Sequence, residues 1–162
     1  MKTLIAYASK TGTTEKCART LAEKIPNATL VDLCAQKPDP SAYDQVIIGG
    51  SVRMGSLHVD ARQYLEGTKP ILLEKPLGIF LCAGFAEKAD AIFANNIEAE
   101  LRTHARQCAC FGGEIDFSKL RGFEKLIAKM ALRSAGENSA ALPHLFPERI
   151  ETFAALFAGE TP

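Results

Sequence analysis

Four hydroxyl side chains gather near the N-terminus in a short segment whose composition suits a bound phosphate. The segment reads Ser9-Lys10-Thr11-Gly12-Thr13-Thr14. Hydroxyl groups donate hydrogen bonds to phosphate oxygens, and glycine adopts backbone conformations that other residues resist. An apolar run, 4–8, precedes the segment, and a helix-period run, 15–25, follows it. Because the start of a helix leaves N–H groups unpaired and attracts negative charge, this strand–helix junction predicts a phosphate site.

Two common phosphate-binding motifs are absent from this segment, which excludes the ligands that they bind. Neither the two-glycine P-loop ending in Lys-Ser/Thr nor the Gly-x-Gly-x-x-Gly dinucleotide fingerprint is present. A hydroxyl-rich loop with one glycine suits a single terminal phosphomonoester. The segment resembles the FMN phosphate loop of flavodoxins, usually written Thr/Ser-x-Thr-Gly-x-Thr. The alternative is a helix start that binds no ligand, with Thr13 or Thr14 as its N-cap.

Apolar runs alternate with helix-period runs along the chain, which predicts an α/β fold with a doubly wound parallel sheet. The expected strands are Thr3–Ala8, Ala28–Leu33, Gln45–Gly50, Pro76–Cys82 and Arg106–Glu114. The expected helices are Thr14–Ile25, Val59–Glu66, Glu87–Ala105 and Pro147–Phe157, with a turn or helix end at Pro70–Leu73. Gly112-Gly113 indicates a bulge or the close approach of another backbone. All 162 residues fit one domain.

Three loops converge on one edge of this predicted sheet. Ligands of such sheets bind outside the carboxyl ends of the strands, at the topological switch point. For the flavodoxin-like order 2-1-3-4-5, that point lies between the first and third strands. The loops that meet there are 9–14, 51–56 and 83–87, so a hydroxyl loop would hold the phosphate while two glycine-bearing loops flank a flat ring. The candidate ring contacts are Ser51, Val52, Arg53, Met54, Gly55, Ala83, Gly84 and Phe85.

Composition and charge exclude several classes of protein. Apolar residues make up 47% of the chain and charged residues 23%, as in ordinary globular domains. The net charge is zero, which argues against binding nucleic acid through bulk charge. We expect a cytoplasmic protein, because the apolar run after Met1 is too short for a signal peptide and no segment has the length of a membrane span.

The cysteines and histidines give no metal-binding pattern, so we predict no metal site. The five cysteines are odd in number and lack a Cys-x-x-Cys motif, and we expect all five to pack in the structure. The three histidines are scattered along the chain and predict no ligand cluster.

A late segment, about 115–145, is additional to the elements that a minimal sheet of this kind needs. We expect an amphipathic helix over Phe123–Ser134, with apolar residues on one side. Its basic side is formed by Lys119, Arg121, Lys125, Lys129 and Arg133. Either this helix packs on the domain with a solvated basic face, or 119–133 contacts a membrane surface or a substrate that carries carboxylates.

Taken as a whole, the chain resembles the flavodoxin-fold family of menaquinone-dependent protoporphyrinogen IX dehydrogenases. The resemblance rests on 4–14, on 46–55 and on 123–130 followed by Gly136-Glu137. It departs from that family at Met54, where an aromatic residue is common, and in having no Trp. The resemblance implies a five-stranded flavodoxin-like fold and FMN as cofactor. It also implies oxidation of protoporphyrinogen IX, a step of heme biosynthesis, with a quinone as electron acceptor.

The resemblance assigns roles to side chains, but it points to no catalytic base. Ser9, Thr11, Thr13 and Thr14, with the N–H groups of 10–14, would bind the phosphate, and Lys10 would screen its charge or face solvent. Met54 and Phe85 would pack on the flavin. Arg53 would face the reduced ring or a substrate carboxylate, or would form only a surface salt bridge. Two alternatives stay open: a flavodoxin-type electron carrier that meets a redox partner protein, and a flavin or quinone reductase. The neutral charge disfavours a carrier, since carrier flavodoxins are typically acidic.

Overall fold

The structure is a computed structural model that describes 1–114, 122, 125–126, 129–130 and 143–159. Its strands are β1 Thr3–Ala8, β2 Ala28–Asp32, β3 Gln45–Arg53, β4 Ser56–Leu57, β5 Leu77–Cys82 and β6 Gln107–Cys110. The parallel strands lie in the order β2-β1-β3-β5-β6, and β4 pairs only with β3. Counting parallel strands alone, this is the predicted order 2-1-3-4-5, so the α/β, flavodoxin-like fold is confirmed.

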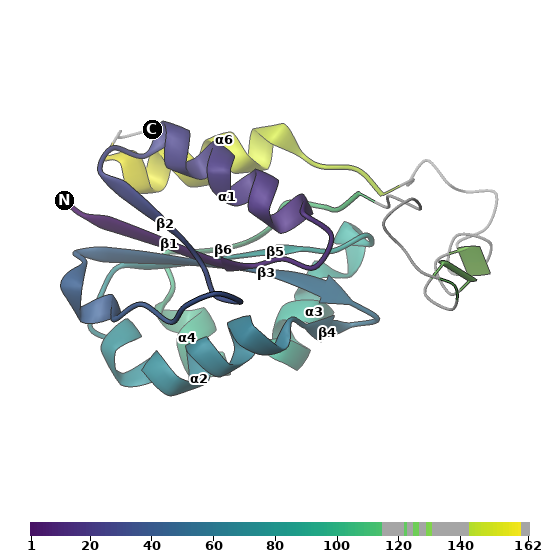
Figure 1. Cartoon of the computed structure of the whole chain (residues 1–162), viewed down its shortest axis with the longest axis horizontal. Helices are drawn as coiled ribbons and strands as arrows, with labels where there is room; N and C mark the ends of the chain where they lie inside the picture. Colours follow the sequence, from purple (N-terminus) through teal and green to yellow (C-terminus); the bar gives the residue numbers. More distant parts are fainter. Residues whose placement is uncertain (115–121, 123–124, 127–128, 131–142, 160–162) are drawn as a thin grey trace.

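Helices cover both faces of the sheet (Figure 1). Their bounds are α1 Thr13–Lys24, η1 Pro40–Ala42, α2 Val59–Leu72, η2 Ala86–Lys88, α3 Ala89–Asn96, α4 Ala99–His104 and α6 Pro147–Ala158. Helices α1 and α6 pack on one face, while α2, α3 and α4 pack on the other. Successive strand residues point to opposite faces, so Leu4 and Ile48 enter the core under α2, and Ile5 and Ile47 enter the core under α1.

Two strand glycines make room for an aromatic cluster under α1 and α6. Phe80, Phe111 and Phe153 are buried, with the Phe80 and Phe111 rings stacked at 4.9 Å between centroids. A Cβ at Gly49 would lie 2.0 Å from the Phe80 ring, and one at Gly78 would lie 2.6 Å from the ring of Phe157. Because these two glycines have no side chain, the aromatic rings and α6 can pack directly against the sheet.

The predicted helix Glu87–Ala105 is wrong, because the structure divides that segment into η2, α3 and α4. The break falls at Ile97, whose backbone is extended (φ −118°, ψ 128°) and whose side chain is buried. Extended backbone at this point allows the buried Ile97 and Leu101 to pack in the same core. Lys69 holds the start of α4 through ion pairs with Glu98 and Glu100.

Two other elements end at residues that differ from the predicted ones. Helix α2 continues through Gly67 and Pro70 to Leu72, beyond the expected end at Glu66, and Leu72 is fully buried. Burial of that last turn outweighs the low helix propensity of glycine and proline. Strand β6 ends at Cys110, short of the expected Glu114, because the chain then turns to meet the segment that precedes α6.

Most of the predicted late helix, Phe123–Ser134, lies outside the described residues. Four described residues of this segment have helical backbone: Lys125, Leu126, Lys129 and Met130. The side chains of Leu126 and Met130 are more than half exposed. Whether 119–133 contacts a membrane or a substrate therefore stays a prediction. Among the described helices, none combines the length and the apolar character that a membrane span requires.

Candidate functional site

The loop between β1 and α1 has the backbone geometry that a phosphate site needs. Gly12 is the N-cap of α1 and has a left-handed backbone (φ 98°), a conformation that favours glycine. No side chain caps this helix start. The N–H groups of Thr13, Thr14 and Glu15 belong to the first turn, where no intrahelical carbonyl is available to them. Ser9 Oγ accepts a 3.0 Å hydrogen bond from the Gly12 N–H, which holds the loop in place.

The hydroxyl groups of this loop fit an anionic ligand. Ser9, Thr11 and Thr13 are partly exposed, and Lys10 is exposed. Thr14 is fully buried, and its Oγ1 lies near the Cys82 thiol but forms no hydrogen bond of ordinary geometry among the described residues. An unpaired buried hydroxyl costs free energy, so a ligand oxygen at the first turn of α1 would stabilise this position. The loop fits a phosphate, and the alternative of a hydroxyl-capped helix start with no ligand is disfavoured because Thr13 and Thr14 lie inside α1.

The second predicted loop, 51–56, is a β-hairpin. Strand β3 continues past the expected end at Gly50 to Arg53, and Val52 and Arg53 pair with Leu57 and Ser56 of β4. Met54 and Gly55 form the two-residue turn, with φ of 52° and 77°. Two positive φ angles characterise the type I′ turn, which suits the twist of paired strands. Arg53 is partly exposed in β3, and Met54 is 82% exposed at the tip.

Asn96, at the end of α3, holds the turn and the β4 arm of this hairpin, a role that no local sequence pattern predicts. Its Oδ1 accepts hydrogen bonds from Leu57 N–H at 2.9 Å and Arg62 Nη2 at 3.0 Å. Its Nδ2 donates to Gly55 O at 2.8 Å and to Ile92 O at 2.9 Å. The side-chain amide therefore fixes the hairpin on the domain, across 39 residues of sequence.

The third loop, Ala83-Gly84-Phe85, is backed by the glycine pair of the late chain. Ala83 N–H donates to Gly112 O at 2.9 Å, and a Cβ at Gly113 would lie 2.9 Å from the Ala83 carbonyl carbon. The predicted close approach of another backbone at Gly112-Gly113 is thereby confirmed. Phe85 is partly buried and precedes η2, and the Lys88 ammonium lies 5.6 Å from the centre of its ring.

Strand register brings the three segments to the same edge of the sheet. Ala8 pairs with Gly50, so Ser9 and Ser51 both follow at the carboxyl ends of β1 and β3. Ser51 in turn pairs with Cys82, so Ala83 follows at the end of β5. The predicted convergence of the three segments is therefore present in the fold, at the switch point between β1 and β3.

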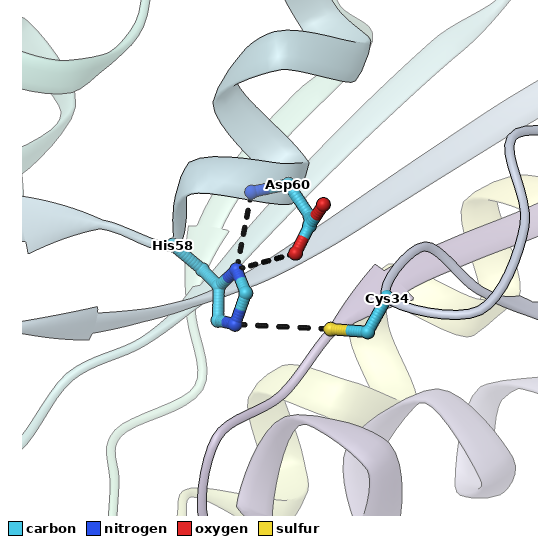
Figure 2. Close-up of side chains that lie close together, drawn as sticks. All are labelled: Cys34, His58 and Asp60. Carbon is cyan, nitrogen blue, oxygen red and sulfur yellow. Dashed lines mark hydrogen bonds and ion pairs between the residues drawn. The ribbon is translucent and has the colours of Figure 1, made fainter.

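A group of titratable side chains beside this edge was missed at the sequence level. Cys34, His58 and Asp60 each offer a ligand atom within 4.8 Å of the others (Figure 2). The spacing of the histidines along the chain did not predict this contact of His58, and the expected absence of a metal site stays a prediction. The prediction that all five cysteines pack is wrong for Cys34, which is exposed, whereas Cys17, Cys82 and Cys110 are buried. The group forms because the end of β2 lies next to the start of α2, a long-range contact that residue spacing does not reveal.

The chemistry of this group is set by negative charge around the thiol. Burial, together with the carboxylates of Asp32 and Asp60, raises the pKa of the Cys34 thiol to about 11. A hydrogen bond from Lys37 lowers the pKa of Asp60, which is therefore a carboxylate at neutral pH. A thiol with so high a pKa is a poor nucleophile near neutral pH, because the thiolate is the reactive form.

Comparison with known proteins assigns the chain to a family. The family model described as "Flavodoxin domain" matches residues 4–141, and the chain belongs to this family. The flavodoxin domain family binds FMN. A solved structure of oxidised flavodoxin 1 from Bacillus cereus has a TM-score of 0.54 and 16% identity. The match covers 83% of this chain and 95% of that flavodoxin. A solved structure of a flavodoxin from Fusobacterium nucleatum bound to flavin mononucleotide has a TM-score of 0.50 and 13% identity. The match covers 72% of this chain and 73% of that flavodoxin.

A curated protein of known activity is also similar to the chain. It is the protoporphyrinogen IX dehydrogenase [quinone] of Escherichia coli strain K12, which is 22% identical over 147 residues. The match covers 84% of this chain and 81% of that protein. Membership of this family indicates a flavodoxin-like flavoprotein with a redox role, as an oxidoreductase or as an electron carrier.

Proposed function

We propose that this chain binds FMN at the edge formed by the three segments, with the phosphate at the start of α1. The observation that carries the proposal is the uncapped, left-handed Gly12 start of α1 together with the unpartnered hydroxyl of Thr14. Ser9, Thr11 and Thr13 hydroxyls and the backbone of 10–14 complete the phosphate contacts, and Lys10 supplies positive charge.

The proposed ring site lies between the hairpin and the loop after β5. Ser51, Val52 and Arg53 form one wall, and the exposed Met54 with Gly55 extends it beyond the sheet. Ala83, Gly84 and Phe85 form the other wall. Asn96 positions the first wall and Gly112 positions the second, so both walls are held by contacts from outside the site. Two preformed walls hold a flat ring with little ordering cost on binding.

The proposed reaction is the FMN-dependent oxidation of protoporphyrinogen IX with a quinone as acceptor, a step of heme biosynthesis. When bound, FMN supplies the acceptance and release of electrons, while the protein binds and orients it. The support is the protoporphyrinogen IX dehydrogenase of Escherichia coli, similar over most of both chains. Arg53, beside the ring site, is proposed to meet negative charge on the ring or a substrate carboxylate. We also propose a cytoplasmic location with peripheral membrane contact through 119–133.

The second candidate is a flavodoxin-type electron carrier or a flavin or quinone reductase. The solved structures similar to the chain include flavodoxins, which favours this class. The net charge of zero favours the dehydrogenase, because an acidic surface is typical of carriers.

Anaerobic mixing of the FMN-loaded protein with protoporphyrinogen IX separates these functions. The proposed dehydrogenase predicts a fast loss of the flavin absorbance, and its recovery on addition of a quinone. The Arg53→Gln variant, which removes the positive charge but keeps a polar side chain, is expected to bind FMN but to react more slowly. Absence of any absorbance change with protoporphyrinogen IX, combined with fast reduction by a flavodoxin reductase, would favour the carrier.

A further inference from the structure

Cys34, His58 and Asp60 bring three different metal-binding atoms together from two elements. Cys34 follows the last residue of β2 by two positions, and its N–H donates to Asp32 Oδ1 at 2.8 Å. His58 is the N-cap of α2, and Asp60 lies in the first turn of that helix. Figure 2 shows the imidazole between the other two side chains, with Nε2 toward the thiol and Nδ1 toward the carboxylate.

The separation of the Cys34 sulfur and the His58 imidazole is close to that of two ligands of one transition metal ion. Cys34 Sγ lies 3.8 Å from His58 Nε2, which is the ring nitrogen that would bind the ion together with the sulfur. Asp60 Oδ2 lies 3.6 Å from the other ring nitrogen, Nδ1, so the carboxylate must turn toward the thiol to reach the same ion. Zinc bonds of about 2.3 Å to sulfur and about 2.0 Å to nitrogen, meeting at a tetrahedral angle, place those two ligand atoms about 3.5 Å apart. The ligand atoms of the three residues all lie within 4.8 Å of one another, so a small closure of side chains would complete the set.

The surroundings hold these side chains and supply negative charge. His58 Nδ1 accepts a 3.2 Å hydrogen bond from the Asp60 N–H, which sets the orientation of the ring. Lys37 Nζ binds Asp60 Oδ1 at 2.7 Å and the Leu33 carbonyl, so Oδ2 is the carboxylate oxygen that faces the imidazole. Asp32 lies beside the thiol, and its carboxylate offsets the charge of Lys37 near an incoming cation.

We propose that Cys34, His58 and Asp60 form a binding site for one divalent transition metal ion of the zinc class, with water completing its shell. The mixed set of sulfur, imidazole and carboxylate ligands suits Zn²⁺ and Co²⁺ and disfavours Mg²⁺ and Ca²⁺, which prefer oxygen. The ion would join the end of β2 to the start of α2. The backbone N–H of His58 donates to the backbone carbonyl of Ser51 at 2.9 Å. The metal site therefore adjoins the first wall of the proposed FMN site, but it does not require FMN.

The test is a Co²⁺ titration of the chelator-treated full-length chain, without and with FMN. We expect saturation at one equivalent, a sulfur-to-cobalt charge-transfer band, and loss of that band when Zn²⁺ is added. Bound Zn²⁺ is also expected to slow alkylation of Cys34 by at least tenfold, because the sulfur is then ligated.

Matched variants decide whether these residues hold the ion. Cys34→Ser is expected to remove the charge-transfer band, while Cys108→Ser, at a partly buried cysteine in β6, leaves it unchanged. His58→Asn keeps a helix-capping residue and is expected to weaken Co²⁺ binding at least tenfold. A circular dichroism spectrum checks that each variant is folded. Absence of saturable binding, or a charge-transfer band that survives in Cys34→Ser, would overturn the proposal.

Discussion

The loop 9–12, proposed to bind the phosphate, and the β-hairpin 51–57 lie side by side at the same sheet edge, yet they are stabilised in different ways. The loop is held by local contacts: Ser9 binds Gly12 three residues away, and α1 starts at once. The hairpin depends on Asn96, which lies 39 residues from Leu57. A phosphate site can therefore be local in sequence, whereas the wall beside the ring depends on the packing of α3.

This comparison predicts that a change in the loop alters phosphate binding without harming the fold. In Thr14→Val, the nearly isosteric side chain removes the buried hydroxyl that has no partner in the described structure. We expect FMN affinity to fall roughly tenfold to a hundredfold, because a hydrogen bond to a charged group contributes about 1.5–3 kcal/mol. Fluorescence titration with FMN measures the loss.

Riboflavin, which lacks the phosphate, is the control ligand for the same variant, and its affinity is expected to stay unchanged. Thr29→Val, on the exposed side of β2, is the control variant. An equal loss of affinity for both ligands would contradict a role of Thr14 at the phosphate.

A change at Asn96 is expected to act on the fold and on ring binding together. Asn96→Ala leaves Leu57 N–H and Gly55 O without their partner, at a cost of about 1–3 kcal/mol in the free energy of unfolding. FMN and riboflavin affinities should fall by the same factor, because the phosphate loop is intact. Urea unfolding and the two titrations measure this. Asn95→Ala, next to it and exposed, should change neither quantity; a selective loss of FMN binding in Asn96→Ala would contradict the division of roles.

A smaller effect of opposite sign is expected at the hairpin tip. Met54 has a left-handed backbone (φ 52°), which costs a non-glycine residue about 1–2 kcal/mol. Met54→Asn introduces a residue that favours this position in type I′ turns, so we expect the unfolding free energy to rise by up to about 1 kcal/mol. If Met54 also packs on the ring, flavin affinity falls in the same variant. A lower unfolding free energy would show that the Met54 side chain makes stabilising contacts of its own.

The smallest effect is expected at the base of the hairpin, where Cys34 meets His58. The carboxylate of Asp60 helps to raise the pKa of the Cys34 thiol to about 11, so less thiolate is present at any lower pH. Removing that charge in Asp60→Asn lowers the thiol pKa. Alkylation of Cys34, followed from pH 8 upward by mass spectrometry of the labelled peptide, should then become faster at each pH. Unchanged or slower alkylation would contradict this account of the thiol.

The difference between local and long-range contacts also explains which features could be predicted from the sequence. The positions of the strands and the shape of the loop before α1 follow from short-range patterns: apolar runs, Gly12 and the hydroxyls around it. The strand order was expected from the resemblance to flavodoxins. The hairpin was not predicted, because Met54-Gly55 lacks the Asn-Gly or Asp-Gly signal of such turns and β4 is only two residues long. The Cys34–His58 contact spans 24 residues, and it depends on how α2 packs beside β2.

The break in the predicted helix Glu87–Ala105 has the same origin. Local sequence spacing favours one continuous helix over this segment, but the Asn96 side chain bonds to the hairpin and the Ile97 side chain is buried in the core. Tertiary contacts decided the backbone at that point, and single-residue propensities carry no information about them.

Equilibrium titration of the flavin-free protein with FMN and with riboflavin tests the central claim most directly. A phosphate site at α1 joined to a ring site between the hairpin and Ala83–Phe85 predicts saturable one-to-one binding of both ligands. FMN should bind at least tenfold more tightly than riboflavin, since only FMN reaches the start of α1. Equal affinities, or no saturable binding of either ligand, would contradict the account.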